Sequence, residues 1–128
     1  MIARRARLLL LPALAGFFAA SPVAAKKPPA RISDPVPDER LYQNAMECKV
    51  RVESILVLAG NAKDRRRYER ALALWTAQEH AIGAKLGKSE GNMTGDEILF
   101  GVGEETRPGS LKRAFICVQY AAEASRQR

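Results

Sequence analysis

Two cysteines, Cys48 and Cys117, constrain the fold of this chain more than any other feature, because they are its only cysteines and lie 69 positions apart. Each belongs to a stretch in which apolar residues recur every three or four positions, the spacing of one helix face. A disulfide between them would close a long loop and stabilise the fold by ~4 kcal/mol in the chain-entropy description. The alternatives are two free buried thiols or cysteines with a chemical role, and the compartment separates these cases.

The first 25 residues indicate the compartment. Three arginines stand within the first seven residues, the apolar run LLLLPALAGFFAA follows, and Val23 and Ala25 occupy the −3 and −1 positions of a cleavage site. This pattern is typical of a secretory signal peptide cut after Ala25. An uncleaved membrane anchor would need ~20 apolar residues, whereas this run is shorter and contains Pro12 and Gly16. We therefore expect export, to the periplasm in a Gram-negative bacterium and to the exterior otherwise.

Export favours a structural disulfide, since exported thiols usually pair. The chain has no CxxC or CxxCH motif, and its single histidine leaves a four-ligand zinc site incomplete. We expect neither a metal nor a cofactor. After removal of the leader, 18 basic residues stand against 14 acidic ones, a net charge of +4. This modest surplus favours a soluble surface and is weak support for nucleic acid as a partner.

The exported part of the chain divides into a tether and a helical domain. Residues 26–39, KKPPARISDPVPDE, carry four of the seven prolines, which predicts a flexible leader, with a proline-rich protein ligand as the alternative. Residues 40–128 show helical periodicity and no strand-like alternation. We predict an all-α, disulfide-linked, up-and-down bundle of four helices. Their expected ranges are about 38–60, 62–86, 95–106 and 110–127.

Local signals place the helix ends. Gly60 is expected to stop the first helix, and Asn61 to cap the second. Thr94 and Glu97 form a capping-box pattern, so the preceding stretch GKSEGNMTG is predicted to be a loop. Ser110 is expected to cap the last helix. If the first and last helices run antiparallel and side by side, the two cysteines fall at about the same height.

The first helix is apolar on two sides. One face carries Leu41, Ala45, Cys48, Val52, Ile55 and Ala59, and nearly the opposite side carries Met46, Val50 and Val57. Such a helix is either central in its domain or has a second partner. The second helix has a single inward face, formed by Tyr68, Ala71, Leu72, Trp75, Ile82 and Leu86. The glycines Gly101 and Gly103 leave it open whether the third element is a regular helix.

The sequence contains only weak candidates for catalytic residues. Glu79 falls near the centre of the second helix's apolar face, where burial would raise its pKa and suit it to general acid catalysis. His80 stands beside it, at the edge of that face. A glutamate at the rim of a core and a lone surface histidine are the structural alternatives. The stretch GVGEET lacks a phosphate-loop pattern, and no GxSxG motif is present.

Candidate partner-binding residues fall into two groups. The run KDRRRYER contains Arg66, Arg67 and Arg70, which suit carboxylates, phosphates or an acidic protein face, although a solvated helix face is the alternative. The apolar candidates are Met46, Val50 and Val57 on the first helix, and Tyr120 with Ile116 on the last.

These observations support two hypotheses for function. The first is an exported, non-catalytic protein that contacts another envelope or secreted protein, as an adaptor, inhibitor, immunity protein or chaperone would. The second is a small exported hydrolase or ligand-binding bundle that uses Glu79 in an apolar pocket. Association of the basic cluster with a membrane surface is a third alternative. Homo-oligomerisation through the second apolar face of the first helix also stays open.

Overall fold

The computed structural model describes residues 35–127, which form four α-helices and no β-strand. The helices are α2 (Asp38–Leu56), α3 (Ala62–Lys85), α4 (Glu90–Glu105) and α5 (Ser110–Arg126). They belong to one compact unit, Val36–Arg128. The expected all-α, four-helix, disulfide-linked fold is confirmed. The predicted signal peptide and most of the proline-rich leader lie outside the described residues. None of the described helices is long and apolar enough to cross a membrane.

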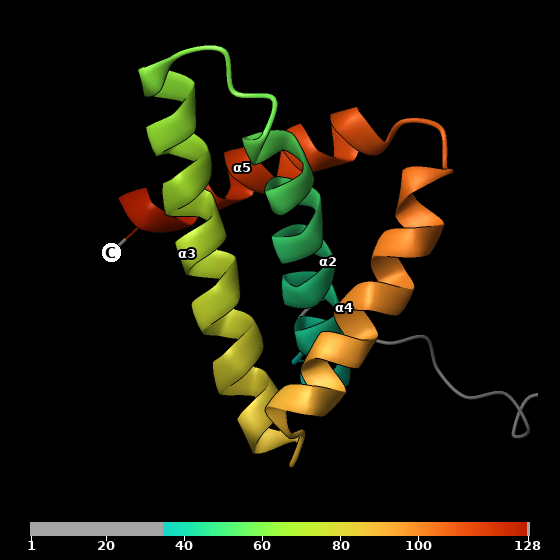
Figure 1. Ribbon diagram of the computed structural model, residues 1–128. Helices are drawn as coiled ribbons and strands as arrows, with labels where there is room; N and C mark the ends of the chain where they lie inside the picture. Colours follow the sequence, from blue (N-terminus) through green and yellow to red (C-terminus); the bar gives the residue numbers. More distant parts are fainter. Residues whose placement is uncertain (1–34, 128) are drawn as a thin grey trace, which may run out of the picture. The chain divides into compact units, whose positions relative to one another are not determined.

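Helix α2 lies at the centre of this unit and contacts each of the other three helices. Helices α2 and α3 run in opposite directions, α4 lies on the far side of α2 from most of α3, and α5 runs across both α2 and α3 (Figure 1). This central position explains why α2 needs two apolar sides, because a helix with partners on both sides must bury both.

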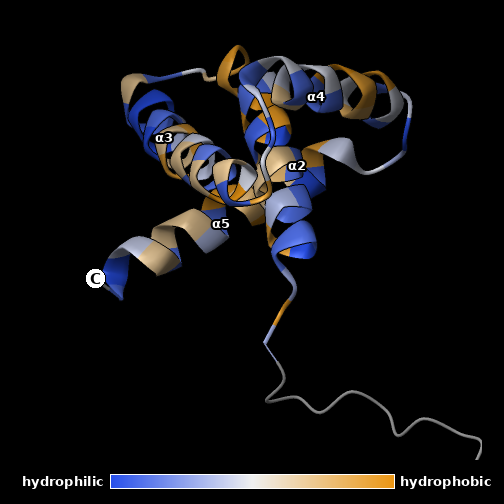
Figure 2. Cartoon of the chain, turned by 90° about the horizontal axis from the view of Figure 1, so that it is seen from below, coloured by the Kyte–Doolittle hydropathy of each residue, from blue (hydrophilic) through white to orange (hydrophobic). Residues whose placement is uncertain are grey.

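The core is divided between those two sides of α2. The larger cluster joins α2, α3 and α5, and its buried members are Ala45, Cys48, Val52, Ile55, Tyr68, Ala71, Trp75, Ala114, Cys117, Val118 and Ala121. The smaller cluster joins α2 to α4 through Tyr42, Met46 and Met93. Helix α4 therefore covers the second apolar side of α2, and its own outward side carries hydrophobic residues, whereas hydrophilic residues dominate α3 (Figure 2).

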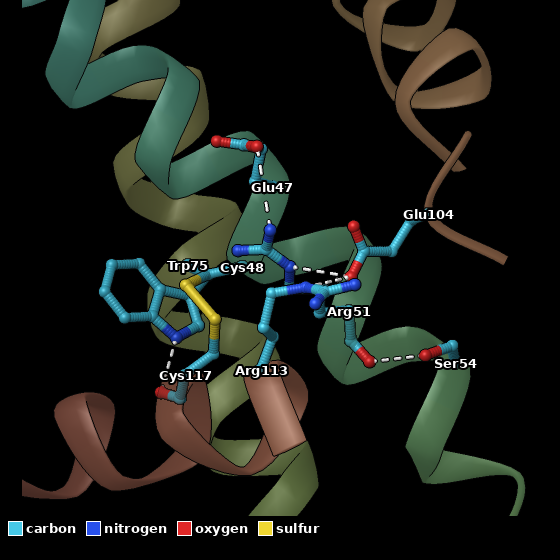
Figure 3. The surroundings of a disulfide bond; sticks show 8 residues. All are labelled: Glu47, Cys48, Arg51, Ser54, Trp75, Glu104, Arg113 and Cys117. Atoms are coloured by element: carbon cyan, nitrogen blue, oxygen red, sulfur yellow. Dashed lines mark hydrogen bonds and ion pairs between the residues drawn. A yellow bond between two sulfur atoms is a disulfide. The ribbon is translucent and has the colours of Figure 1, made fainter. Parts of the chain in front are cut away.

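The predicted disulfide is present. Cys48 and Cys117 are bonded with their Cα atoms 5.4 Å apart, and each is 2% exposed. Because α5 crosses α2, the bond lies where the two helices meet, at the centre of the larger cluster. The Trp75 indole packs beside it and donates a hydrogen bond from Nε1 to the Cys117 carbonyl oxygen at 3.0 Å (Figure 3). The disulfide thus fixes α5 to α2, and the Trp75 hydrogen bond fixes α5 to α3.

Of the four helix ends predicted from local signals, one agrees with expectation and three do not. Asn61 caps α3 as predicted, with its Oδ1 accepting from the Asp64 amide at 2.8 Å. The prediction that Gly60 stops the first helix is wrong, because α2 ends at Leu56 in a turn closed by the Leu58 amide, which donates to the Ile55 carbonyl oxygen. The turn that follows the helix lies outside the core, as the 83% exposure of Val57 and the 69% exposure of Leu58 show.

Helix α4 begins five residues earlier than expected. Ser89 and Asn92 form the capping box, and the Thr94–Glu97 prediction is wrong because α4 is already helical there and Glu97 pairs with Lys49. Much of the stretch predicted to be a loop is therefore helix, which continues without interruption to Glu105.

Ser110 is likewise not the cap of α5 but its first residue. The N-cap position belongs to Gly109, whose φ of 82° lies in the left-handed region that favours glycine. The Arg113 guanidinium donates to the Pro108 carbonyl oxygen at 2.8 Å, which supports the same turn.

Candidate functional site

Glu79, the weak catalytic candidate, is fully buried where α2, α3 and α4 meet. Its Oε1 lies 3.7 Å from Lys49 Nζ, and the same ammonium donates to Glu97 Oε1 at 2.6 Å. Neither oxygen of Glu79 has a hydrogen-bond partner among the described residues. His80 points outward with its side chain 50% exposed, although its Nε2 lies 3.7 Å from Glu79 Oε1. The structure thus joins two carboxylates, one lysine and the edge of one imidazole.

Burial raises the pKa of Glu79 to about 7, and the neighbouring Glu97 carboxylate acts in the same direction, while the Lys49 ammonium opposes both. One lysine cannot neutralise two carboxylates, so a proton on Glu79 relieves the repulsion. The expectation of a glutamate with a raised pKa is therefore met. The neighbours responsible, Lys49 and Glu97, come from other helices and carried no signal in the sequence near Glu79.

Glu79 lies outside the main clefts of the described part of the molecule. Four clefts on the described part of the molecule have volumes of about 480, 380, 260 and 600 Å³, and Glu79 lines none of them. Trp75, which is also on α3 and buried, donates its indole N–H to the Cys117 carbonyl oxygen of α5. Within residues 35–127, no three His, Cys, Asp or Glu side chains gather so that they could hold a metal ion.

A second buried acid, Glu104, was missed by the sequence analysis. Its Oε1 accepts from Arg113 Nε at 2.7 Å and from Arg51 Nε at 3.3 Å, while Glu47 lies 3.7 Å from Arg51 Nη2 (Figure 3). Burial alone would raise the pKa of Glu104, but the hydrogen bonds from Arg113 and Arg51 outweigh it and hold the pKa below its usual value. The network ties α4 to α2 and α5 beside the disulfide. The only sequence signal was that Glu104 shares the inward face of α4 with Met93 and Phe100.

The arginines predicted to bind a partner have a different environment. Arg66, Arg67 and Arg70 are exposed on α3. No carboxylate of the described residues lies within ion-pair distance of them, in contrast to Arg51 and Arg113. Arg67 and Arg70, together with Arg126 from α5, line the cleft of about 260 Å³ between these two helices.

The predicted apolar contact residues separate into buried and exposed ones. Met46 is 2% exposed and is covered by α4, whereas Val50 is half-buried against the same small cluster and lines the cleft of about 380 Å³. Val57 is 83% exposed and Tyr120 56% exposed. The sequence analysis missed the outward side of α4, where three aliphatic residues are 62–77% exposed: Ile98, Leu99 and Val102.

Comparisons with known proteins identify no relative. No family model matches the chain, and neither a curated protein nor a solved structure matches it significantly.

Proposed function

We propose that this chain is an exported, non-catalytic protein that binds an acidic surface of another protein through the arginines of α3. The observation that carries this proposal is the contrast between two kinds of arginine. Arg51 and Arg113 are held by the buried Glu104, whereas Arg66 and its neighbours face solvent without an internal carboxylate in the described part of the chain. Guanidinium groups that are not paired internally are free to form bidentate hydrogen bonds with the carboxylates of a partner.

The exposed apolar residues favour a protein as this partner. Phe115 and Tyr120 on α5, the helix that runs across α3, are 44% and 56% exposed, and the Phe115 ring lies 6.4 Å from the Tyr68 ring of α3. Aromatic side chains at this exposure suit a protein interface, in which an apolar centre is surrounded by charged residues. A nucleic acid would instead require a long track of basic residues that follows its phosphates.

Export is part of the proposal. The disulfide between Cys48 and Cys117 is buried in the larger core cluster, and such bonds persist in oxidising compartments. It supports the interpretation of the first 25 residues as a signal peptide. The partner would then be another envelope or secreted protein.

Catalysis by Glu79 keeps one supporting observation, its raised pKa of about 7, which suits a general acid near neutral pH. However, a general acid must reach the reacting group, and Glu79 is enclosed by α2 and α4. The same pKa follows from burial beside Glu97 without any catalytic role. We therefore favour binding over catalysis.

The test is capture of the partner by the disulfide-bonded chain from Lys26 to Arg128, immobilised and exposed to the envelope fraction of its source. The captured protein is then purified and its affinity measured for three forms of the chain. These are the wild type, a variant with Arg66, Arg67 and Arg70 all changed to Glu, and a control variant with Arg40, Lys85 and Lys112 changed to Glu. Both variants change the net charge equally, and all six positions are exposed.

We expect the purified partner to bind the wild type and the control variant and to lose binding to the α3 variant. Equal binding to all three forms would refute the proposed surface. Binding to anionic lipid vesicles, with no protein that rebinds after purification, would replace the proposal with membrane association.

A further inference from the structure

We infer that the cleft between α3 and α5 seats two neighbouring carboxylates from an acidic helical segment of the partner, an inference that rests on the proposed function. The proposed function requires only that the basic side of α3 makes the contact. The cleft adds a location, a set of three arginines from two helices, and a spacing for the acidic residues that it accepts.

The arginines frame the cleft from both sides. Arg67 and Arg70 stand one helical turn apart on α3, and Arg126 lies in the last turn of α5. The C-terminal half of α5 passes the N-terminal half of α3, which brings these residues together although Arg70 and Arg126 are 56 positions apart (Figure 1). Arg66, which is exposed on the same turn of α3, does not line the cleft.

Small side chains form the remaining lining of the cleft. These residues are Ala71, Val118, Ala121, Ala122 and Ser125. Ala71 and Ala121 are each 3% exposed, so the helices pack closely beneath the arginines. Ser125 donates its hydroxyl proton to the Ala121 carbonyl oxygen at 3.0 Å and is not a donor to a ligand. The hollow of about 260 Å³ therefore offers an apolar surface below and guanidinium donors at its rim.

This combination fits glutamate and aspartate side chains better than free phosphate. The apolar lining can contact the methylene groups of an acidic side chain while its carboxylate reaches the arginines. Residues three apart on a helix have Cβ atoms about 5–6 Å apart, so Arg67 and Arg70 match acidic residues that are three or four apart on a partner helix. Phosphate has no such apolar part and would use the arginines alone.

The acidic residues of α3 and α5 do not pair with the three arginines of the cleft. Asp64 accepts from the Asn61 amide group at 3.0 Å at the start of α3. Glu69 and Glu123 lie on the same two helices, and neither forms an ion pair within residues 35–127. The cleft thus presents three cations without a paired anion in the described structure. Charge complementarity selects an acidic occupant.

The experiment uses the oxidised chain from Lys26 to Arg128 and a synthetic helical peptide of about 20 residues, long enough to be helical in water. One face of the peptide carries Glu residues four positions apart, and a second peptide has Gln at those positions. Binding is measured by titration calorimetry, and the arginine Nε–H signals of the protein are followed by NMR. We expect the Glu peptide to shift the signals of Arg67, Arg70 and Arg126, and the Gln peptide to bind at least tenfold more weakly.

Single alanine variants separate the cleft from the wider basic surface. Arg67→Ala and Arg126→Ala should each weaken binding of the Glu peptide by at least about tenfold, the loss expected for a charged hydrogen bond. Arg66→Ala, which removes the same charge outside the cleft, should change it by less than about twofold, the size of an exposed ion pair's contribution. All three positions are exposed, and thermal unfolding checks that each variant is folded.

The outcomes distinguish the two proposals. If all three variants weaken binding equally, the basic surface binds acidic protein but the cleft does not seat it. If the Glu and Gln peptides bind alike, the proposed function fails together with the inference. If inorganic phosphate displaces the Glu peptide at equimolar concentration, the cleft is a phosphate site and the inference is overturned.

Discussion

The buried carboxyl group of Glu79 should make the stability of this fold depend on pH, and Glu79→Gln should remove that dependence. The side chain is fully buried, and its pKa rises from 4.5 to about 7 on folding. A group whose pKa is raised in the folded state stabilises the fold most below its unfolded pKa, and this contribution is lost as pH rises through the folded pKa. The shift corresponds to about 3 kcal/mol of stability, which is lost as the pH rises from 4.5 to above 7.

Glutamine has nearly the shape of a protonated glutamate but cannot ionise. Urea unfolding of the oxidised chain, followed by circular dichroism from pH 4.5 to pH 8.5, gives the free energy of unfolding of both forms. We expect the difference between Glu79→Gln and wild type to move by about 3 kcal/mol in favour of the variant over this range. Groups that titrate in both forms, such as Glu104, largely cancel from the difference.

Glu123→Gln provides a matched control, since it makes the same chemical change at an exposed position of α5. It should follow the wild type across the whole pH range. A constant difference between Glu79→Gln and wild type would refute the reasoning, because Glu79 would then ionise equally in both states. A difference that moved in the opposite sense would show that Lys49 outweighs burial and the repulsion from Glu97.

Three further predictions concern helix packing, the Glu104 network and the disulfide, and each is checked by measuring the free energy of unfolding. Gly103→Ala should stabilise the fold by about 1 kcal/mol, because nothing lies within 4 Å of the added Cβ. Gly83→Ala should destabilise the fold by about 1–3 kcal/mol, because its Cβ would lie 2.5 Å from Met93 Sδ. Equal effects of the two substitutions would contradict the packing described for Gly83. Glu104→Gln should cost about 3 kcal/mol, because it leaves Arg113 without a carboxylate partner and Arg51 with Glu47 alone, and a neutral result would show that the network is not stabilising. Cys117→Ser should cost about 4 kcal/mol, and a loss below 1 kcal/mol would show that the loop it closes is already ordered when unfolded.

Local signals predicted much of this fold. Asn61 caps α3 as expected because a cap is a contact between residues three positions apart. The position of Cys48 on the same face as Val52 marked it as a core residue, and the period of the apolar residues was enough to indicate helices. The two apolar sides of α2 predicted either a central helix or a second partner, and the sequence did not show whether α4 or another molecule covers Met46.

Contacts between helices account for what was missed. Ser89 and Thr94 both start a capping pattern, and only the packing of Met93 into the α2–α4 cluster places the start of α4 at the earlier one. Glu104 is 53 positions from Arg51, so no spacing in the sequence indicated their hydrogen bond. The direction in which α5 crosses α3 is a tertiary property too. It is this crossing that adds Arg126 to the arginines recognised in the sequence.

The central claim is that these arginines recognise an acidic partner. Reversing the charges on both sides of the proposed interface tests this claim most directly, because the attraction changes while the shape of the cleft changes little. Two proteins are compared, the wild type and the double variant Arg67→Glu/Arg70→Glu. The affinity of each is measured for the Glu peptide and for a Lys peptide, which has Lys at the acidic positions. The account predicts that the wild type binds only the Glu peptide and that the variant binds the Lys peptide better than the Glu peptide. If the variant keeps the preference of the wild type, these arginines do not recognise acidic partners and the account is contradicted.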